Sequence, residues 1–292
     1  MLTDRPNIIV TGGCGFIGSH LTKRLLDQGF AVTVVDDNRT GKVFQQHKFV
    51  EYHKVSVENF NPHQHNVEPP VGIFHLANSP RVRRSLEYPT ETIVNNVSTT
   101  CAVADWARIF NCKLFFATSS STQYAESRGN PYTFSKLVCE EALNLYRNLY
   151  SLDYVLMYFY NVYGPGEADY GEYSTVVRKF KTDYLAGKPL TIFGTGKKER
   201  DFTHVDDVVQ GLLQLLADPA LPSTAHFGKG DPRTIASIAE AFDHPIVHTF
   251  DRQGEAEKTL CLTPYIECPN DVYDYIINWV KENKRDASSS SR

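Results

Sequence analysis

The sequence predicts an α/β fold in which helices cover a doubly wound parallel sheet, and three observations carry this prediction. Short apolar runs suited to buried strands recur at 7–11, 31–36, 72–76, 113–118 and 154–158. Segments of helical character lie at 16–28, 90–110 and 131–149. A glycine-rich turn joins the first strand to the first helix. Strands that alternate with helices in this way form parallel sheets with helices on both faces.

The first elements follow from residue type. The runs NIIVT at 7–11 and AVTVVD at 31–36 are rich in β-branched residues, as buried strands are. The helix between them is expected to end just before Gly29, because glycine readily adopts the left-handed conformation that follows a helix. Three further apolar runs are interpreted as buried strands of the same sheet.

The pattern changes after residue 164, where elements become shorter and Pro and Gly punctuate the chain. We therefore expect a dinucleotide-binding domain at 1–164, to which 200–224 returns. A smaller, mixed α/β substrate-binding lobe is expected at 165–199 and 225–285. The serine-rich end, 286–292, is expected to be disordered.

Composition excludes several classes of function. The chain has 292 residues, 41% hydrophobic and 22% charged, which is typical of a globular protein. A net charge of −4 without a basic cluster argues against a nucleic-acid partner. No apolar run approaches about 18 residues and no signal peptide is evident, so no membrane span is expected. The six cysteines form no CxxC pair, so we expect no metal site and a reducing, cytoplasmic location.

The glycine-rich turn has the pattern Gly12-x-x-Gly15-x-x-Gly18 between a predicted strand and a predicted helix. Such a turn brings backbone N–H groups and a helix N-terminus to a pyrophosphate, and larger side chains would block that approach. Asp36 ends the second strand, where a carboxylate accepts the adenosine ribose hydroxyls. This predicts a Rossmann-type site. Asp36 would repel a 2′-phosphate, which favours NAD over NADP, although the nearby Arg39 weakens that preference.

Tyr132 and Lys136 place a phenol and an ammonium one helical turn apart. A phenol is a poor base at neutral pH, and a nearby cation would lower its pKa. Such a pair can take a proton from a sugar hydroxyl while hydride leaves the same carbon. The hydroxyl run Ser119–Ser121 follows a predicted strand, at the sheet edge where open α/β sheets build their sites.

Together these motifs resemble the extended short-chain dehydrogenase/reductase family, within its sugar-nucleotide epimerase/dehydratase group. The resemblance covers nearly the whole chain. It rests on TGGCGFIGSHL (11–21), VVDDNRTG (34–41), FHLA (74–77), the Tyr132/Lys136 pair, NVYGPG (161–166) and GTGKKERDFTHVDDVV (194–209).

The resemblance implies roles for individual residues. Tyr132 would be the catalytic acid/base, Lys136 its partner and a nicotinamide-ribose ligand, and Ser120, four residues before Tyr124, the third hydroxyl. The implied cofactor contacts are Gly12, Gly15, Phe16, Ile17, Gly18, Asp36, Asn38, Ser56, Val57, Leu76, Ala77, Asn96, Ser119, Tyr132, Lys136 and Tyr158. The implied substrate contacts are Arg83, Ser121, Thr122, Asn161, Thr191, Phe193, Arg200, Arg252, Glu255 and Thr259.

Simpler interpretations stay open for the three arginines. Arg200 precedes Asp201 and suits a structural ion pair, Arg252 suits a plain turn, and Arg83 suits a solvated charge at a helix start. The chain also departs from the family pattern, because Tyr158 stands where an Arg commonly precedes the NVYG motif. The segment from Tyr124 to Tyr132 is shorter than usual as well.

Within the group, the stretch Ser120–Tyr124 carries no carboxylate, whereas dehydratases and UDP-glucuronate decarboxylases place one there. The pattern is most similar to UDP-galactose (UDP-glucose) 4-epimerases, which oxidise C4 of a UDP-sugar through NAD and reduce it again on the other face. The small Thr259 stands near a position where glucose-selective epimerases carry Tyr, so N-acetylated sugars are expected to fit.

Two alternatives to a 4-epimerase remain at this point. One is a dehydratase, decarboxylase or 4-keto reductase on the same fold. The other is a catalytically silent dinucleotide sensor, against which retention of the Tyr–Lys pair argues. The helices expected at about 90–110 and 132–149 resemble those that form a homodimer interface in this family.

Overall fold

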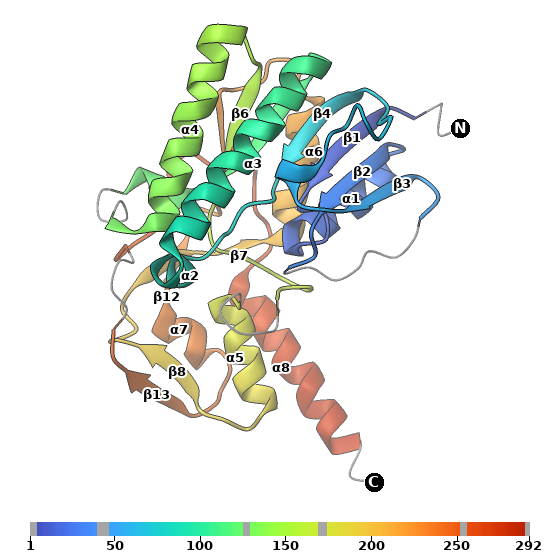
Figure 1. The fold of residues 1–292 in the computed structure, drawn as a ribbon. Helices are drawn as coiled ribbons and strands as arrows, with labels where there is room; N and C mark the ends of the chain where they lie inside the picture. The colour runs from blue at the N-terminus through green and yellow to red at the C-terminus, as the bar shows by residue number, and fades with distance from the viewer. Residues whose placement is uncertain (1–4, 40–46, 125–128, 169–173, 252–255, 290–292) are drawn as a thin grey trace. The chain divides into compact units, whose positions relative to one another are not determined.

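The computed structural model describes residues 5–39, 47–124, 129–168, 174–251 and 256–289, and the chain folds as two compact units (Figure 1). Unit 1 comprises Met1–Phe159 and Val209–Ala225, and unit 2 comprises Tyr160–Val208 and His226–Arg292. The chain thus leaves unit 1 before residue 164. Residues 200–208, which the sequence assigned to the dinucleotide-binding domain, belong to unit 2 because their short strands pair there.

Unit 1 is built on a seven-stranded sheet with the order β11-β6-β5-β4-β1-β2-β3. Its strands are β1 (Asn7–Thr11), β2 (Ala31–Asp36), β3 (Val50–Lys54), β4 (Pro70–His75), β5 (Lys113–Ser119), β6 (Tyr154–Phe159) and β11 (Thr224–Phe227). Strands β1 to β6 pair in parallel. The predicted doubly wound α/β class is confirmed. Strand β3 was not predicted, because VEYHK is half-exposed and has no apolar run.

Helices cover both faces of this sheet (Figure 1). On one face α3 (Pro89–Phe110) packs against α4 (Pro131–Tyr150), and the other carries α1 (Phe16–Asp27) with the later part of α6 (Val205–Ala217). Burial explains the arrangement, since β1 and β2 are buried along their whole length. The core between the sheet and α3 and α4 includes Ile9, Ile73, Trp106, Phe116 and Leu143.

The start of α4 is fixed locally. Pro131 occupies the first helical turn, where its missing N–H costs nothing, and the Asn130 side chain accepts a hydrogen bond from the Thr133 N–H at 2.9 Å. These caps set where Tyr132 and Lys136 lie along the helix. The remaining elements of unit 1 are η1 (Val57–Asn59), α2 (Val82–Glu87) and η2 (Ser120–Gln123).

Unit 2 is a mixed α/β unit of short strand pairs. Strand β7 (Val162–Tyr163) pairs with β10 (Thr203–His204), β8 (Leu190–Phe193) with β13 (Ile246–Thr249), and β9 (Glu199–Asp201) with β12 (Pro232–Thr234). Its helices are α5 (Val176–Leu185), α7 (Ile235–Glu240) and α8 (Val272–Ser289). They enclose a core that includes Phe180, Ile192, Phe202, Phe242 and Ile276. Helix α8 extends into the segment 286–292 that its serine run predicts to be disordered.

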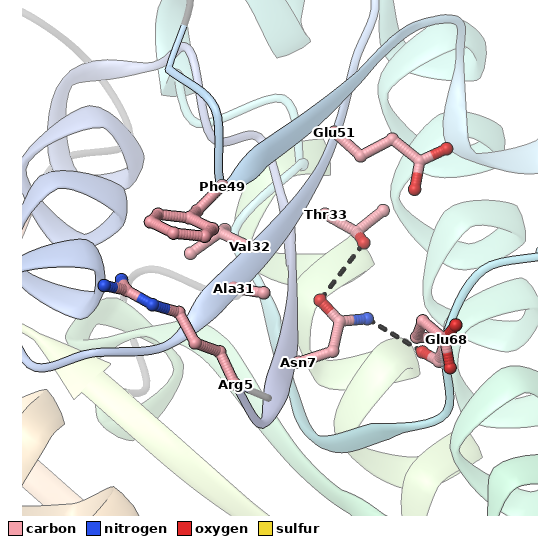
Figure 2. A pocket seen from close by; sticks show the side chains of 8 residues that line it. All are labelled: Arg5, Asn7, Ala31, Val32, Thr33, Phe49, Glu51 and Glu68. Atoms are coloured by element: carbon pink, nitrogen blue, oxygen red, sulfur yellow. Dashed lines mark hydrogen bonds between the residues drawn. The ribbon is translucent and has the colours of Figure 1, made fainter. Parts of the chain in front are cut away.

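The two edges of the unit 1 sheet differ. At the amino ends of the strands, eight residues line a pocket: Arg5, Asn7, Ala31, Val32, Thr33, Phe49, Glu51 and Glu68 (Figure 2). There Asn7 donates to the Glu68 carbonyl at 2.8 Å, and the Arg5 guanidinium lies 3.7 Å from the Phe49 ring centre. Open α/β sheets bind ligands at the opposite, carboxyl edge. Among the described residues, no helix is both long and apolar enough to cross a bilayer.

We expect Gly18→Ala to lower the stability of unit 1. A Cβ at this position would lie 2.1 Å from the Gly12 carbonyl oxygen, so loop and helix would have to move apart. Overpacking of this kind costs about 1–3 kcal/mol of unfolding free energy, which urea denaturation followed by circular dichroism measures. Gly129→Ala is the matched control, because no atom of the described residues lies within 4 Å of a Cβ there. Equal stability of the two variants would contradict this packing.

Candidate active site

The glycine-rich turn lies tightly against the end of β4. Gly12 has a φ of +72°, and a Cβ there would lie 2.8 Å from the Ala77 nitrogen and from the Leu76 carbonyl carbon. The predicted contacts Leu76 and Ala77 are therefore brought to the turn. Gly15 is the N-cap residue of α1, where Phe16 and Ile17 present N–H groups that have no acceptor within the helix. The turn thus offers backbone donors and a helix N-terminus to an anion.

Asp36 ends β2 and is 8% exposed. One carboxylate oxygen accepts the Cys14 N–H at 2.9 Å and the other accepts the Asn38 N–H at 2.8 Å. Asn38 has a φ of 61° and accepts the Tyr52 hydroxyl at 2.8 Å, which secures the turn. An ionised carboxylate has about four acceptor positions, so Asp36 retains capacity for ribose hydroxyls. The glycine cradle and this carboxylate together fit NAD.

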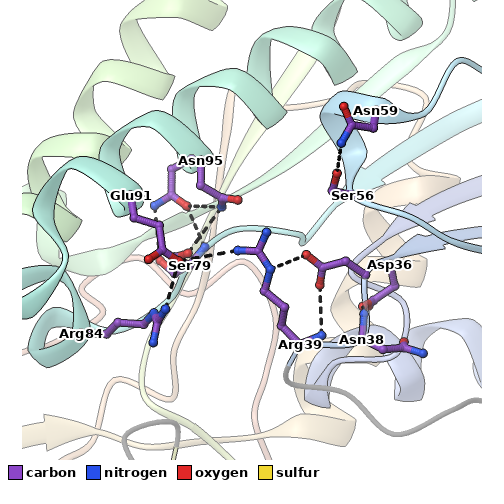
Figure 3. A network of polar contacts seen from close by, with 11 residues as sticks. Asp36, Asn38, Arg39, Ser56, Asn59, Ser79, Arg84, Glu91 and Asn95 are labelled. Carbon is purple, nitrogen blue, oxygen red and sulfur yellow. Dashed lines mark hydrogen bonds and ion pairs between the residues drawn. The ribbon is translucent and has the colours of Figure 1, made fainter.

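Two of the predicted cofactor contacts, Ser56 and Val57, have structural roles. Ser56 caps η1 and its hydroxyl oxygen accepts from the Asn59 amide at 2.8 Å (Figure 3). Val57 is 3% exposed and its side chain belongs to the hydrophobic core. Any contact of Val57 with a cofactor would therefore be made by its backbone.

Lys136 is 4% exposed. Its ammonium donates to the Asn78 side-chain oxygen and to the Ala117 carbonyl, both at 2.6 Å, and lies 4.9 Å from the Phe116 ring centre. Burial lowers the pKa of Lys136 to about 8, although Cys139 and the charge of Glu140 act against this shift. Asn78, which follows the FHLA run at the carboxyl end of β4, was not predicted as a site residue.

Tyr132 lies one turn before Lys136 on α4. Burial raises the pKa of Tyr132, while a hydrogen bond with the Ser119 hydroxyl and the charge of Arg81 lower it, and burial prevails. That the Lys136 ammonium favours the phenolate of Tyr132 stays a prediction.

A chain of hydroxyl groups extends from Tyr132. The Ser119 hydroxyl, which bonds to Tyr132, lies 2.8 Å from that of Ser121, and the Ser121 hydroxyl lies 3.0 Å from that of Thr133. The resemblance assigned the third hydroxyl to Ser120. The structure brings Ser119 to Tyr132, and the role of Ser120, the first residue of η2, stays a prediction.

Glu140 was not predicted, although it lies one turn after Lys136. Its carboxyl group accepts hydrogen bonds from Thr118, from Thr122 at 3.1 Å and from Tyr158 at 3.3 Å. Burial raises the pKa of Glu140, against the effect of these bonds and of Lys136. Thr122 and Tyr158, predicted to contact the ligands, are thus brought together by Glu140. The four-residue spacing from Lys136 is the sequence signal that could have identified it.

Asn96 is fully buried on α3. It accepts the Ser79 N–H at 2.7 Å and donates to the Ser135 hydroxyl at 2.9 Å. It therefore ties the segment after β4 to the helix that carries Tyr132 and Lys136.

Arg83 is an exposed residue of α2. Its side chain is 68% exposed and its Nε atom is 3.6 Å from a Glu87 carboxylate oxygen, one turn along α2. This matches the solvated helix charge that the sequence left open. Arg81, the N-cap residue of α2, is instead the arginine whose charge acts on Tyr132.

Unit 2 holds a second group of predicted residues. The Asn161 amide donates to the Thr259 hydroxyl at 3.0 Å and to the Asp201 carbonyl at 3.3 Å. Thr259 is 7% exposed, so its side chain serves to position Asn161. The buried Asp201 carboxylate accepts backbone N–H groups of Lys229, Gly230 and Cys261.

The other predicted residues of unit 2 are spread along its strands. Arg200 donates from one guanidinium nitrogen to the carbonyls of Glu199 at 2.9 Å and Glu257 at 3.4 Å. Thr191 and Phe193 lie on β8 in register with Val247 and Thr249. Arg252 and Glu255 lie outside the described residues.

Comparison with known proteins identifies the family of this chain. A model of the NAD dependent epimerase/dehydratase family matches residues 8–227. The chain belongs to this family. NAD is therefore its cofactor, and the family acts on sugar nucleotides.

Similar proteins within the family catalyse different reactions. A UDP-glucose 4-epimerase of Mycolicibacterium smegmatis is 35% identical over 226 residues, which are 70% of this chain and 72% of the relative. A UDP-N-acetyl-alpha-D-glucosaminuronate decarboxylase of Bacillus cytotoxicus is 28% identical over 263 residues, covering 84% and 81%. The structure of Thermotoga maritima UDP-glucose 4-epimerase with UDP-glucose superposes with a TM-score of 0.86 at 26% identity, covering 96% and 99%.

We expect Glu140→Gln to flatten the pH dependence of stability. The pKa of Glu140 is higher in the folded protein than in the unfolded chain, where it is about 4.3. The contribution of Glu140 to stability is therefore complete below about pH 4.3 and is lost as the pH rises through its pKa in the folded protein. Gln stays neutral, so the variant should lose less stability than the wild type as the pH rises from about 4 towards neutrality. Thermal unfolding across this range measures the difference.

The exposed neighbour Glu141 supplies the control. Glu141→Gln should follow the wild-type pH dependence. If Glu140→Gln also does so, the carboxyl group is not held as the structure has it.

Proposed function

We propose that the protein catalyses NAD-dependent 4-epimerisation of a UDP-sugar, glucose/galactose or their N-acetylated forms, through a transient 4-keto intermediate. The observation that carries the proposal is the set of groups around Tyr132. The chain from β5 into η2 supplies hydroxyl groups and, from Ser119 to Tyr124, no carboxylate. Removal of a proton from the C4 hydroxyl needs only Tyr132, whereas elimination would also need a carboxyl group beside the sugar. The 4-epimerases among the similar proteins support this choice.

The proposed roles follow from the geometry. Tyr132, as the phenolate favoured by the Lys136 ammonium, takes the proton that leaves the C4 hydroxyl and returns it when C4 is reduced, and Ser119 orients the phenol. The Lys136 ammonium keeps a positive charge beside the reacting carbon and binds the nicotinamide ribose. NAD, when bound, supplies the acceptor for the C4 hydride and returns it. The turn Gly12–Gly15 and Asp36 bind the pyrophosphate and the adenosine ribose.

For the nucleotide sugar we propose ligands in unit 2. Arginine binds phosphate oxygens through its planar fork, which suits Arg200 and Arg252 to the diphosphate. Asn161, Thr191, Phe193 and Glu255 complete the proposed set. Thr259 acts through Asn161, because its hydroxyl group is bonded to that amide.

One observation favours a second candidate, a decarboxylase or dehydratase. Glu140 places a carboxyl group in hydrogen-bond contact with Thr122, in the turn where such enzymes need one. It is, however, bound by three hydroxyl groups in all. This makes it less suited than a free carboxylate to remove a proton from a sugar.

We expect proton NMR of the protein with NAD to show C4 interconversion of UDP-glucose, UDP-galactose or UDP-GlcNAc, each supplied in its own tube, and a fourth tube with UDP-glucuronate tests for decarboxylation. Tyr132→Phe should lower the rate by about 100-fold or more, because the proton acceptor is lost. Tyr150→Phe, at the exposed end of the same helix, should leave it unchanged. Release of CO₂ or a dehydrated sugar in place of the epimer would support the second candidate and overturn the first.

We also propose that the protein is a homodimer formed through α3 and α4. These helices expose apolar side chains, among them Val94 at 58%, Ile109 at 51%, Leu145 at 55% and Leu149 at 62%. An interface would remove this surface from water.

Light scattering after size exclusion should then give about twice the chain mass of 33.0 kDa. Leu145→Glu with Leu149→Glu should shift the protein to the monomer, because it buries charge in the interface. Leu185→Glu, equally exposed on α5 of unit 2, is the control. A wild-type monomer at micromolar concentration would contradict the proposal.

The same cysteines that predicted a reducing compartment are all free in the structure. Free thiols, three of them buried and three partly buried, suit proteins of the cytoplasm, where disulfides are rare. We propose a cytoplasmic location on this ground.

A further inference from the structure

Arg39 follows the end of β2 and its guanidinium group lies between two carboxylates (Figure 3). Its Nε atom is 2.7 Å from an Asp37 carboxylate oxygen, and its backbone N–H donates to the other Asp37 oxygen at 3.0 Å. Its Nη1 atom is 3.7 Å from a Glu91 carboxylate oxygen on α3. Asp37 and Glu91, which lie far apart in the sequence, thus both contact the Arg39 side chain and set its direction.

Glu91 is itself fixed from a second direction. The same carboxylate oxygen accepts a hydrogen bond from Arg84 of α2 at 3.0 Å, and the Arg84 guanidinium lies 4.8 Å from the Tyr88 ring centre (Figure 3). Glu91 also lies in the first turn of α3, where a negative charge is favourable. Arg84 and the start of α3 therefore hold Glu91 in place independently of Arg39.

Arg39 lies close in the sequence to the proposed binding residue for the adenosine ribose, which connects this ion-pair cluster with the choice of cofactor. Asp36, three residues earlier, is the proposed acceptor for the adenosine ribose hydroxyls, and Asn38 turns the chain between them with a φ of 61°. A 2′-phosphate on that ribose distinguishes NADP from NAD, and a nearby arginine is the group that accommodates it. Arg39 is the arginine that immediately follows this turn.

We propose that Asp37 and Glu91 determine the preference for NAD over NADP by holding the Arg39 guanidinium away from the ribose 2′ position. Glu91, on a different element from the ribose-binding strand, is thereby a specificity-determining residue. The proposal rests on the placement of the adenosine ribose at Asp36 and not on which reaction the sugar undergoes.

The exposure of the three side chains limits how strongly Asp37 and Glu91 hold Arg39. The Arg39 side chain is 50% exposed, that of Glu91 43% and that of Asp37 32%, so the pairs are screened by water. Each such exposed pair stabilises its geometry only weakly. The two carboxylates therefore bias the orientation of Arg39 by a modest amount, and a double substitution is needed to release it.

The test is isothermal titration calorimetry of NAD and NADP into the full chain freed of bound nucleotide. Asp37→Asn with Glu91→Gln should lower the Kd for NADP by about tenfold, because two exposed pairs are lost, and change that for NAD by less than about twofold. The same pair of substitutions combined with Arg39→Ala should leave the Kd for NADP at the wild-type value or above it.

Two controls separate the proposal from simple electrostatics. Asp105→Asn removes a negative charge from the far end of α3, where Asp105 pairs with Arg108 at 3.3 Å, and should leave the Kd for NADP unchanged. If the gain for NADP persists in the Arg39→Ala background, loss of negative charge alone explains it and the proposal is overturned.

Other outcomes are equally decisive. An unchanged Kd for NADP, with normal NAD binding, overturns the role of Asp37 and Glu91 while leaving the proposed reaction untouched. Failure of the wild type to bind NAD overturns the cofactor site itself, and this proposal with it. None of these measurements uses epimerase activity, so failure of this proposal can be distinguished from failure of the proposed function.

Discussion

The buried ammonium group of Lys136 is the interaction on which the site of unit 1 depends. Moving a charge out of water is costly unless polar groups replace the lost hydration. Here the Asn78 amide and the Ala117 carbonyl supply acceptors at 2.6 Å. These acceptors come from the segment after β4 and from β5, so the ammonium is held only while both strands and α4 keep their places. Tyr132, one turn away on the same helix, is positioned by the same packing.

A parallel sheet explains why residues from so many segments meet. Its strands all end at one edge, and the connections that leave that edge carry the polar groups. The turn after β1, Asp36 at the end of β2, the Leu76–Ser79 segment after β4 and the hydroxyls after β5 are all of this kind. Buried hydrogen bonds then link neighbouring connections, as Asn96 links Ser79 to Ser135 of α4. In unit 2 a buried side chain likewise links separate segments, because the Asp201 carboxylate accepts three backbone N–H groups.

The fold and the cofactor turn could be predicted from the sequence because each depends on a local pattern. Apolar runs bury strands, and the glycines stand where a Cβ would collide with the backbone. Other features depend on side-chain direction, which spacing does not reveal. The contact of Ser119 with Tyr132, and the effect of the Arg81 charge on it from a helix cap, are of this kind. Glu140 was missed because its partners, Thr118 and Tyr158, lie on separate strands.

The most direct test of the account follows the hydrogen at C4. A UDP-sugar carrying deuterium at C4 is converted by the wild-type protein with NAD, and the isotope content of both epimers is measured by mass spectrometry and NMR. If Tyr132 handles only the hydroxyl proton and the C4 hydride is returned to the same carbon, both epimers keep their deuterium and gain none from the solvent. Loss of deuterium to water, or its appearance at another carbon, would contradict the proposed chemistry.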